Sequence, residues 1–253
     1  MSTPTDVATA NVLRTLRVDD ARAALGGVLD LAPDLVGLQE WSLRRHRLLR
    51  ETGSVEIVPR IGIRLGRVRE GSYVWSTPVV GGCPVGARAD RFELLTSATR
   101  MLDWIGRGER EDRPLKLEPP RFATLAVYRD RQAAQTVSLL NYHLTPGVQV
   151  DGKYREDRPL LVARHQREVR NVERLVREQQ ARGHVVYAVG DSNFDGLRLA
   201  GLTSGWSGRE DEPGTLGARR KVDDVHASGP AASVTLLSNG SDHKAVIMRR
   251  DQD

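Results

Sequence analysis

Short apolar runs recur along the chain, and several of them end on a polar residue suited to metal or phosphate chemistry. The runs at residues 34–38, 136–140 and 184–189 are rich in leucine and valine, which is typical of buried strands. Groups just past a buried strand end are held by a rigid scaffold and remain open to solvent. We therefore predict that the polar ends form one site. Its segments are Ala10-Asn11, Leu38-Gln39-Glu40, Leu140-Asn141-Tyr142-His143, Gly190-Asp191-Ser192-Asn193 and Gly240-Ser241-Asp242-His243.

Between these strands, the spacing of apolar positions predicts helices. Residues 159–180 show this most clearly, because leucines and valines recur there at helical intervals with Arg and Glu between them. Residues 19–31 and 42–52 are also predicted to be helical, and residues 205–221 are predicted to be a mobile loop. Further strands are predicted at 121–128, 222–227, 234–237 and 245–249. Many strands with few helices favour an α/β layered sandwich, in which two sheets pack face to face with helices outside.

Length and composition limit the classes of function. The 253 residues, 39% hydrophobic and 28% charged, are typical of a globular protein with one large domain or two small ones. No apolar stretch approaches the roughly 20 residues of a membrane span, and residues 1–12 lack the features of a signal peptide. The single cysteine, Cys83, excludes an intrachain disulfide and a multi-cysteine zinc site. We therefore expect a monomeric protein of the reducing cytoplasm.

The charge balance favours a polyanionic partner. Lys and Arg total 38 against 33 Asp and Glu, a net charge of +5, and arginine can bind phosphate through two hydrogen bonds at once. Arginine-rich clusters at 44–47, 60–69 and 209–221 are predicted to flank the site. Two alternatives remain: an arginine-rich composition that follows from genomic GC content, and a solvated charged surface.

Glu40 is the first candidate metal ligand. A carboxylate at the end of a buried strand is costly unless it is paired or bound to a metal. With Asn11 and Asp242 it would offer the oxygen ligands that Mg²⁺ prefers. The alternative is an ordinary carboxylate at the start of the helix predicted at 42–52.

Asp191 and Asn193 are candidates for orienting an attacking water. They lie two residues apart after Gly190, which allows a sharp turn that would aim both side chains at one volume. The alternative is an Asx turn that only closes the strand.

Two histidines complete the candidate chemistry. Asp223 would fix the tautomer of His243 and raise its basicity, as acid–base catalysis near neutral pH requires, and Asp224 is the alternative partner. Asn141 and His143 alternate along one strand, so both are expected on the same face, where they could bind phosphoryl oxygens.

The order of these motifs resembles the endonuclease/exonuclease/phosphatase superfamily, which has the fold of pancreatic deoxyribonuclease. That family has an Asn after the first strand, an LQE motif, an N-x-H strand end, a GD-x-N turn, an Asp-bearing strand and a C-terminal SDH, and this chain has all six in that order. The resemblance implies one catalytic domain over residues 1–253, a four-layer sandwich of two mainly antiparallel sheets flanked by helices. Two departures are Ser192, where the family has an aromatic residue, and the absence of a tyrosine after Asp223.

The resemblance also implies a hydrolase of phosphoesters that depends on Mg²⁺ or Mn²⁺. Glu40 would be the principal metal ligand, with Asn11 and Asp242 in or near the coordination sphere. Asp191 and Asn193 would position the nucleophilic water, and His243, oriented by Asp223, would serve in acid–base chemistry. The residues implied to bind phosphate are Asn141, His143, Asn193 and His243.

The expected substrate is nucleic acid, because of the basic charge balance and the arginine-rich clusters; DNA is expected before RNA, which remains open. One alternative is a phosphodiesterase or phosphatase that acts on a small molecule or a lipid headgroup. Another is a non-catalytic scaffold that keeps the fold.

Overall fold

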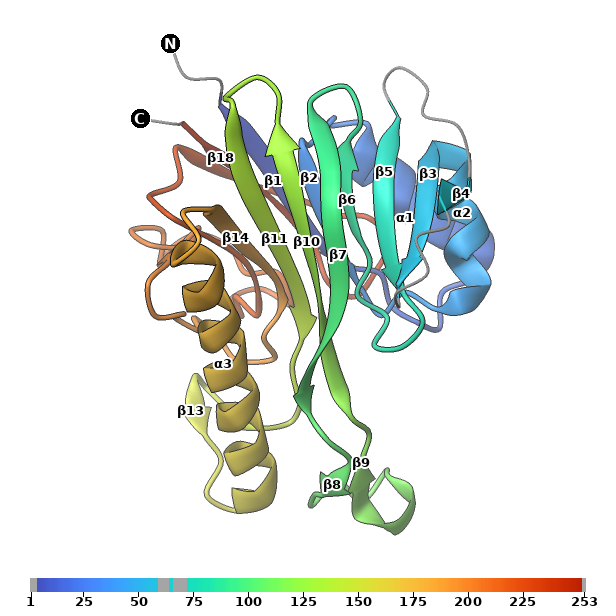
Figure 1. The fold of residues 1–253 in the computed structure, drawn as a ribbon. Helices are drawn as coiled ribbons and strands as arrows, with labels where there is room; N and C mark the ends of the chain where they lie inside the picture. Colours follow the sequence, from blue (N-terminus) through green and yellow to red (C-terminus); the bar gives the residue numbers. More distant parts are fainter. Residues whose placement is uncertain (1–3, 59–63, 66–71, 252–253) are drawn as a thin grey trace.

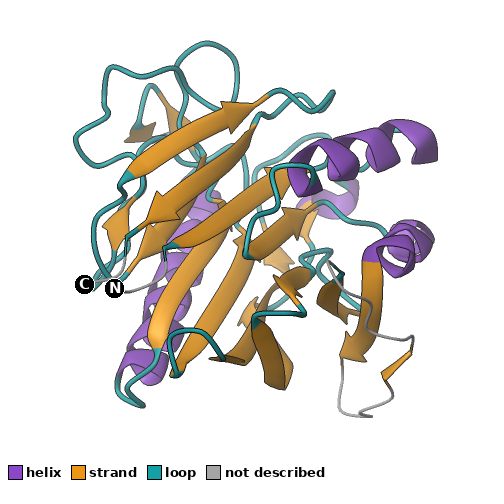
Figure 2. Cartoon of the chain, turned by 90° about the horizontal axis from the view of Figure 1, so that it is seen from above, coloured by secondary structure: helices purple, strands orange, loops and turns teal. Residues whose placement is uncertain are grey.

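Two β-sheets packed face to face make up most of the fold, with helices against their outer faces (Figures 1 and 2). The computed structural model describes residues 4–58, 64–65 and 72–251. Most of the arginine-rich cluster predicted at 60–69 lies outside the described residues. The predicted α/β sandwich is confirmed.

The first sheet has eight strands in the order β17-β18-β1-β2-β6-β5-β3-β4. Their bounds are β1 Thr5–Asn11, β2 Leu35–Gln39, β3 Gly53–Val58, β4 Arg64–Leu65, β5 Tyr73–Pro78, β6 Val85–Arg88, β17 Ser233–Leu237 and β18 Ala245–Arg250. The second sheet has six strands in the order β15-β16-β14-β11-β10-β7. Their bounds are β7 Phe92–Asp103, β10 Arg121–Asp130, β11 Gln135–His143, β14 Val185–Asp191, β15 Thr203–Ser204 and β16 Asp223–Ala227. Antiparallel pairs predominate, while β1–β2, β11–β14 and β3–β5 are parallel.

The helices match the apolar periodicity. Helix α1 (Val18–Leu29) and helix α3 (Pro159–Gln180) lie where the pattern predicts them. The helix predicted at 42–52 is divided into a 3₁₀ turn η1 (Leu43–Arg45) and helix α2 (His46–Thr52). The division falls at Arg45, which is buried although its neighbours Arg44 and Arg47 are exposed.

Three apolar clusters hold these layers together. The inner cluster lies between the two sheets and includes Leu35, Phe92, Tyr128 and Leu139. A second cluster packs α1 and α2 against the outer face of the first sheet, and a third packs α3 against the second sheet. Strands that are covered on both faces explain the nearly continuous apolar runs in the sequence.

The strand directions bring the predicted polar ends to one end of the sandwich. In the parallel pair β1–β2, Asn11 lies beside Gln39, and in β11–β14, His143 lies beside Asp191. Strand β16 runs antiparallel to β14 and places Asp223 beside Asp191. The carboxyl ends of β1, β2, β11 and β14 therefore lie at the same end of the sandwich as the start of β16.

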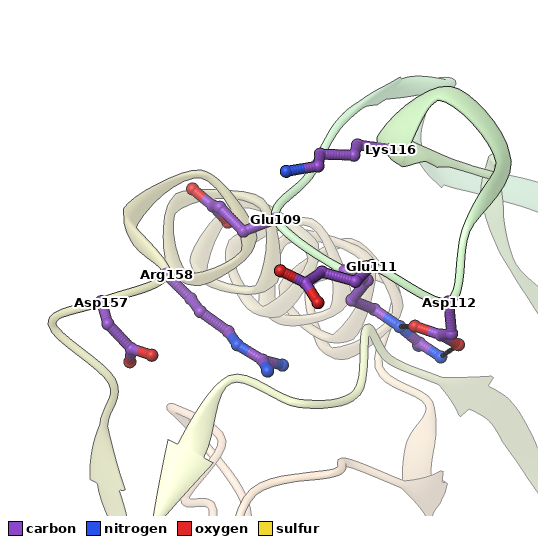
Figure 3. Close-up of a pocket in the computed structure, with 7 residues that line it drawn as sticks. Glu109, Glu111, Asp112, Lys116, Asp157 and Arg158 are labelled. Carbon is purple, nitrogen blue, oxygen red and sulfur yellow. Dashed lines mark hydrogen bonds and ion pairs between the residues drawn. The ribbon is translucent and has the colours of Figure 1, made fainter.

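A hairpin of β8 (Gly106–Arg107) and β9 (Leu117–Glu118) extends beyond the same end, beside the start of α3 (Figure 1). The short turn η2 (Pro114–Lys116) lies within it, and a second small hairpin joins β12 (Gln149–Val150) to β13 (Lys153–Tyr154). A cavity of about 450 Å³ between the first hairpin and α3 is lined by seven charged residues, at positions 109–112, 116, 157 and 158 (Figure 3). The Glu109 carboxylate accepts hydrogen bonds from the N–H groups of Leu160 and Leu161, so it caps α3. None of the predicted site residues lines this cavity.

Candidate active site

Asn11 lies between two of the predicted carboxylates. Its Nδ2 donates a hydrogen bond to Asp191 Oδ2 at 3.0 Å and a longer one to Glu40 Oε1 at 3.5 Å. Its Oδ1 is buried and has no hydrogen-bond partner. A buried acceptor without a partner is costly, so this oxygen is suited to a ligand. Asn11 thus connects Glu40 to Asp191 and leaves one oxygen available.

Glu40 occupies a strained turn directly after β2. Its φ is 56°, in the left-handed region that non-glycine residues seldom adopt. One carboxylate oxygen, Oε2, accepts the N–H of Arg14 at 3.0 Å, and the side chain is half-buried. The turn therefore holds the carboxylate near Asn11 while leaving it open to solvent.

Asp191 is buried at the end of β14. Its Oδ1 accepts the N–H of Asn193 at 2.7 Å, which is the Asx turn, while its Oδ2 faces Asn11. Gly190 has φ +151°, and a Cβ there would lie 2.1 Å from the carbonyl oxygen of Tyr142, so only glycine fits. Burial and the nearby charge of Asp223 raise the pKa of Asp191 to about 7. The Asx turn is therefore present and uses only Oδ1, and the chemical role of Asp191 stays a prediction.

Ser192 anchors the turn where the resembling family has an aromatic residue. Its Oγ lies 2.8 Å from the carbonyl oxygens of both Val222 and Phe194, which share its one hydrogen as acceptors. Asn193, at φ 52°, donates its Nδ2 to the carbonyl of Leu144 at 3.1 Å. Hydrogen bonds thus fix this turn to its neighbours in place of aromatic packing.

His243 pairs with Asp223. Its Nδ1 donates to Asp223 Oδ2 at 2.8 Å and lies 4.0 Å from Asp191 Oδ2. Burial by itself would lower the pKa of His243, but the hydrogen bond and charge of Asp223, with the charge of Asp191, raise it to about 9. Asp224, the alternative partner, accepts the hydroxyl of Ser204 instead. The histidine is therefore a cation at neutral pH.

The donor atoms fit a hard divalent cation. The carboxylates of Asp191 and Asp223 each have an oxygen within 4.8 Å of the other and of a ring nitrogen of His243, which as a cation is not itself a ligand. Asp223 Oδ1, like Asn11 Oδ1, is buried without a hydrogen-bond partner. Carboxylate and amide oxygens of this kind are the ligands that Mg²⁺ and Mn²⁺ accept. Asn11, which is buried, links this group to the half-buried Glu40.

Asp242 precedes His243 in the chain, and its charge helps to raise the pKa of His243. It is exposed, and its Oδ1 accepts the hydroxyl of Ser241 at 3.1 Å. Among the residues that the structure describes, no hydrogen bond joins Asp242 to Glu40 or Asn11. Ser241 does reach the site, because its Oγ accepts the N–H of Leu13 at 3.1 Å.

His143 also lies near Asp191. Its Nε2 is 3.5 Å from Asp191 Oδ2. Burial, together with the charges of Arg121 and His243, holds the pKa of His143 well below its usual value. The two histidines of the site therefore carry different charges at neutral pH.

Asn141 is tied into the interface between the sheets. Its Nδ2 donates to the carbonyls of Leu38 and Pro84, both at 2.8 Å, and its Oδ1 accepts Gln39 Nε2 at 2.6 Å. Gln39 in turn bonds to Thr9. The amide hydrogens of Asn141 are thus already used in aligning the LQE segment with β11.

Arg121 is a candidate that the sequence pattern does not single out. It begins β10, and its Nη1 donates to the carbonyl oxygen of His143 at 3.5 Å. Its Nε is buried and has no hydrogen-bond partner. Burial lowers the pKa of Arg121, although the charge of Glu168 opposes this. Nothing in the sequence distinguishes it from the other arginines, because its role follows from the pairing of β10 with β11.

The basic residues of the predicted clusters include both exposed and buried side chains. Arg44 and Arg47 are exposed, whereas Arg45 is 2% exposed and bonds to backbone carbonyls, so Arg45 does not present its guanidinium to a phosphate. Lys221 is also turned inward, with its Nζ bonded to the carbonyls of Glu210 and Glu212.

The two facing sheets, with polar strand ends gathered at one edge, have the fold of the endonuclease/exonuclease/phosphatase proteins, as the motif order predicts. The chain is similar to D. rerio TDP2 humanised by 14 mutations (TM-score 0.66, 15% identity, 98% of this chain and 99% of that one). It is also similar to the Bacteroides vulgatus endonuclease/exonuclease/phosphatase (TM-score 0.65, 15% identity, 99% and 100%). A third similar structure is the human Nocturnin catalytic domain with bound sulfate (TM-score 0.61, 17% identity, 98% and 95%).

At the level of sequence, no protein-family model and no curated protein matches the chain. Among the residues that the structure describes, none of the helices has the length and apolar character needed to cross a membrane.

Proposed function

We propose that the protein is a divalent-metal-dependent phosphodiesterase that hydrolyses nucleic acid, DNA rather than RNA. The observation that carries this proposal is the chain of contacts from Glu40 through Asn11 to Asp191, next to the Asp223–His243 pair. It joins oxygen donors, a carboxylate that can accept a proton near neutral pH, and a cationic imidazole. Hydrolysis of a phosphodiester needs all three.

Glu40 and Asn11 Oδ1 would hold the cation, Mg²⁺ or Mn²⁺, with Asp242 at most an outer contributor. The bound cation would neutralise charge on the phosphoryl oxygens. Asp191 Oδ2 would orient the attacking water and accept its proton, since the pKa of Asp191 is about 7. Asn193 Oδ1 would accept a second hydrogen bond from that water.

The cationic groups would act on the phosphate. His243, held by Asp223, would donate its Nε2–H to a non-bridging oxygen as charge builds on it. Arg121 Nε, which has no partner, would serve a second oxygen. His143 would contact the scissile phosphate as a neutral imidazole. Asn141 would act on phosphate only indirectly, by holding the LQE segment in place.

Charge near the site supports a nucleic-acid substrate. The chain carries a net charge of +5, and Arg14, Arg17, Arg44 and Arg47 are exposed in the segments that follow Asn11 and Glu40. A second structure of D. rerio TDP2, with a TM-score of 0.64 at 17% identity, is complexed with a single-strand DNA product. We further propose a monomer in the cytoplasm, which the single cysteine supports.

Exposed apolar side chains at the same end support a second candidate, a phosphodiesterase for lipid headgroups. Leu43, Trp104 and Leu115 are 57%, 63% and 86% exposed. The two leucines would lie against a lipid surface more readily than against stacked bases, and a tryptophan suits the boundary of a lipid surface.

The deciding experiment measures hydrolysis of plasmid DNA, bis(p-nitrophenyl) phosphate and phospholipid vesicles with Mg²⁺, Mn²⁺ or EDTA. Metal-dependent nicking of DNA that Glu40→Gln abolishes is expected. The cavity residue Glu111, exposed and outside the predicted site, supplies the control Glu111→Gln, which should leave nicking unchanged. Cleavage of vesicles with intact DNA would overturn the nucleic-acid proposal and leave the lipid candidate. No hydrolysis of any of the three would overturn both.

A further inference from the structure

Arg45 is the most heavily bonded side chain near the candidate metal site. Its Nη1 donates to the carbonyl of Val12 at 2.9 Å. Its Nη2 lies 2.9, 2.9 and 2.7 Å from the carbonyls of Leu13, Arg14 and Leu16. One guanidinium therefore gathers four carbonyl oxygens of the loop at residues 12–16. The side chain is 2% exposed, so it is not available to a substrate.

The loop at residues 12–16 joins three segments of the candidate site. It follows Asn11 directly, and the N–H of Arg14 donates to Glu40 Oε2 at 3.0 Å. The N–H of Leu13 donates to Ser241 Oγ at 3.1 Å, two residues before His243. Because Arg45 holds the loop carbonyls on its own side, the N–H group of Leu13 faces Ser241 and the N–H group of Arg14 faces Glu40.

The charge of Glu40 also acts on this guanidinium. Burial lowers the pKa of Arg45, and the charge of Glu40 opposes that effect, so the two groups are electrostatically coupled. The ring of Trp41, which follows Glu40, has its centroid 6.0 Å from Arg45 Cζ. A buried cation is tolerated here because four carbonyl dipoles and one carboxylate compensate it.

We propose that Arg45 is a positioning residue for divalent-cation binding: by clamping the loop at 12–16 it presets the orientation of Glu40 and Asn11 for the cation. This inference rests on the proposed role of Glu40 as a metal ligand. Lysine cannot replace Arg45, because a single ammonium lacks the planar fork that reaches several carbonyls at once. The effect on the metal is indirect, as for other groups that orient metal ligands.

The test is Mn²⁺ binding by the full chain without substrate, followed by electron paramagnetic resonance of free Mn²⁺. Arg45→Lys is expected to raise the Kd for Mn²⁺ about 10-fold or more, as loss of a ligand-orienting partner does. Arg50→Lys, an exposed arginine on α2, is the matched control and should leave the Kd unchanged. Urea unfolding of both variants measures stability separately. A lower urea midpoint for Arg45→Lys with an unchanged Kd would overturn the proposal, because it would assign Arg45 a structural role alone.

A second variant guards against loss of folding in Arg45→Lys. Arg14→Pro removes the N–H that binds Glu40 Oε2 and keeps the carbonyl that Arg45 holds. Weaker Mn²⁺ binding by Arg14→Pro supports the proposal, and wild-type binding overturns it.

Glu40→Gln separates this inference from the proposed function. Wild-type Mn²⁺ affinity in Glu40→Gln would remove Glu40 from the metal site, and both would fail. Loss of affinity in Glu40→Gln but in neither arginine variant would overturn the Arg45 inference alone.

Discussion

The buried Arg91 cluster at one end of the sandwich and the candidate site at the other both bury charged side chains, but they complete the hydrogen bonds of those side chains differently. At the end away from the candidate site, Arg91 is 1% exposed and bonds to both oxygens of Asp130 and to Asp34. It also donates to the carbonyl of Pro4 and the hydroxyl of Thr5. Asp130 accepts two further backbone N–H groups, from residues 132 and 133.

At the site end, buried polar atoms lack partners. Asn11 Oδ1, Asp223 Oδ1 and Arg121 Nε are buried and unpaired, and two carboxylates share one small volume. An incomplete polar network destabilises a fold unless a ligand completes it. The comparison therefore separates charges that serve stability from charges that are kept available for chemistry.

Asp191→Asn provides the largest expected effect on activity. Removing the group that accepts the proton of the attacking water should lower kcat/KM about 10²–10⁴-fold. The free energy of unfolding should not fall, because the variant relieves the repulsion between Asp191 and Asp223. Hydrolysis kinetics and urea unfolding check both statements. Wild-type kcat/KM in the variant would contradict the role of Asp191.

Asp130→Ala should lower the free energy of unfolding and leave activity unchanged. The variant leaves the buried Arg91 charge without its main partner, and the free energy of unfolding should fall by about 3–5 kcal/mol. Activity per folded molecule should stay at the wild-type value, because Asp130 lies at the opposite end of β10 from Arg121. Urea unfolding with active-site titration measures both. A variant that keeps its stability and loses activity would contradict the assignment of the Arg91–Asp130 pair to stability.

A divalent cation should stabilise only the site end. At a Mn²⁺ concentration about 100 times its Kd, the free energy of unfolding should rise by about 2.7 kcal/mol. The rise should be absent in Glu40→Gln and preserved in Asp130→Ala. Thermal unfolding with Mn²⁺ and with EDTA measures it. An equal rise in Glu40→Gln would show that the cation binds elsewhere.

His243 should make stability depend on pH. Its pKa is raised to about 9, so it adds stability that is fully present below about pH 6.5 and is lost as the pH rises through 9. The expected loss over this range, on the order of 2 kcal/mol, should be absent in His243→Gln. Urea unfolding between pH 6 and 10 tests this. The same slope in both proteins would show that His243 is not the titrating group.

Much of the fold could be predicted from the sequence because it depends on local patterns. The valine-rich run at 184–189 became β14, and the periodicity at 159–180 became α3 with the same bounds. The helix predicted at 42–52 was only partly correct. Its periodicity does not reveal that Arg45 turns inward to four carbonyls, and this interaction depends on a loop about 30 residues earlier.

The candidate site was predictable in its motifs but not in its contacts. The motif order brought Asn11, Asp191 and His243 to attention, and the structure gathers them at one end. Arg121 could not be singled out, since its place beside His143 follows from strand pairing. The roles of Asn141 and Asp242 stay predictions. The sequence could not show that Asn141 is bonded inside the sheet interface or that Asp242 is exposed.

By itself, the sequence determined which segments are buried strands and which polar residues terminate them, because apolar periodicity is a local property of the chain. Only the tertiary structure decided which polar groups meet, which arginines face inward and which buried atoms stay without partners. Those outcomes depend on strand order, register and burial, and these bring together residues as distant in the chain as Asn11 and Asp191.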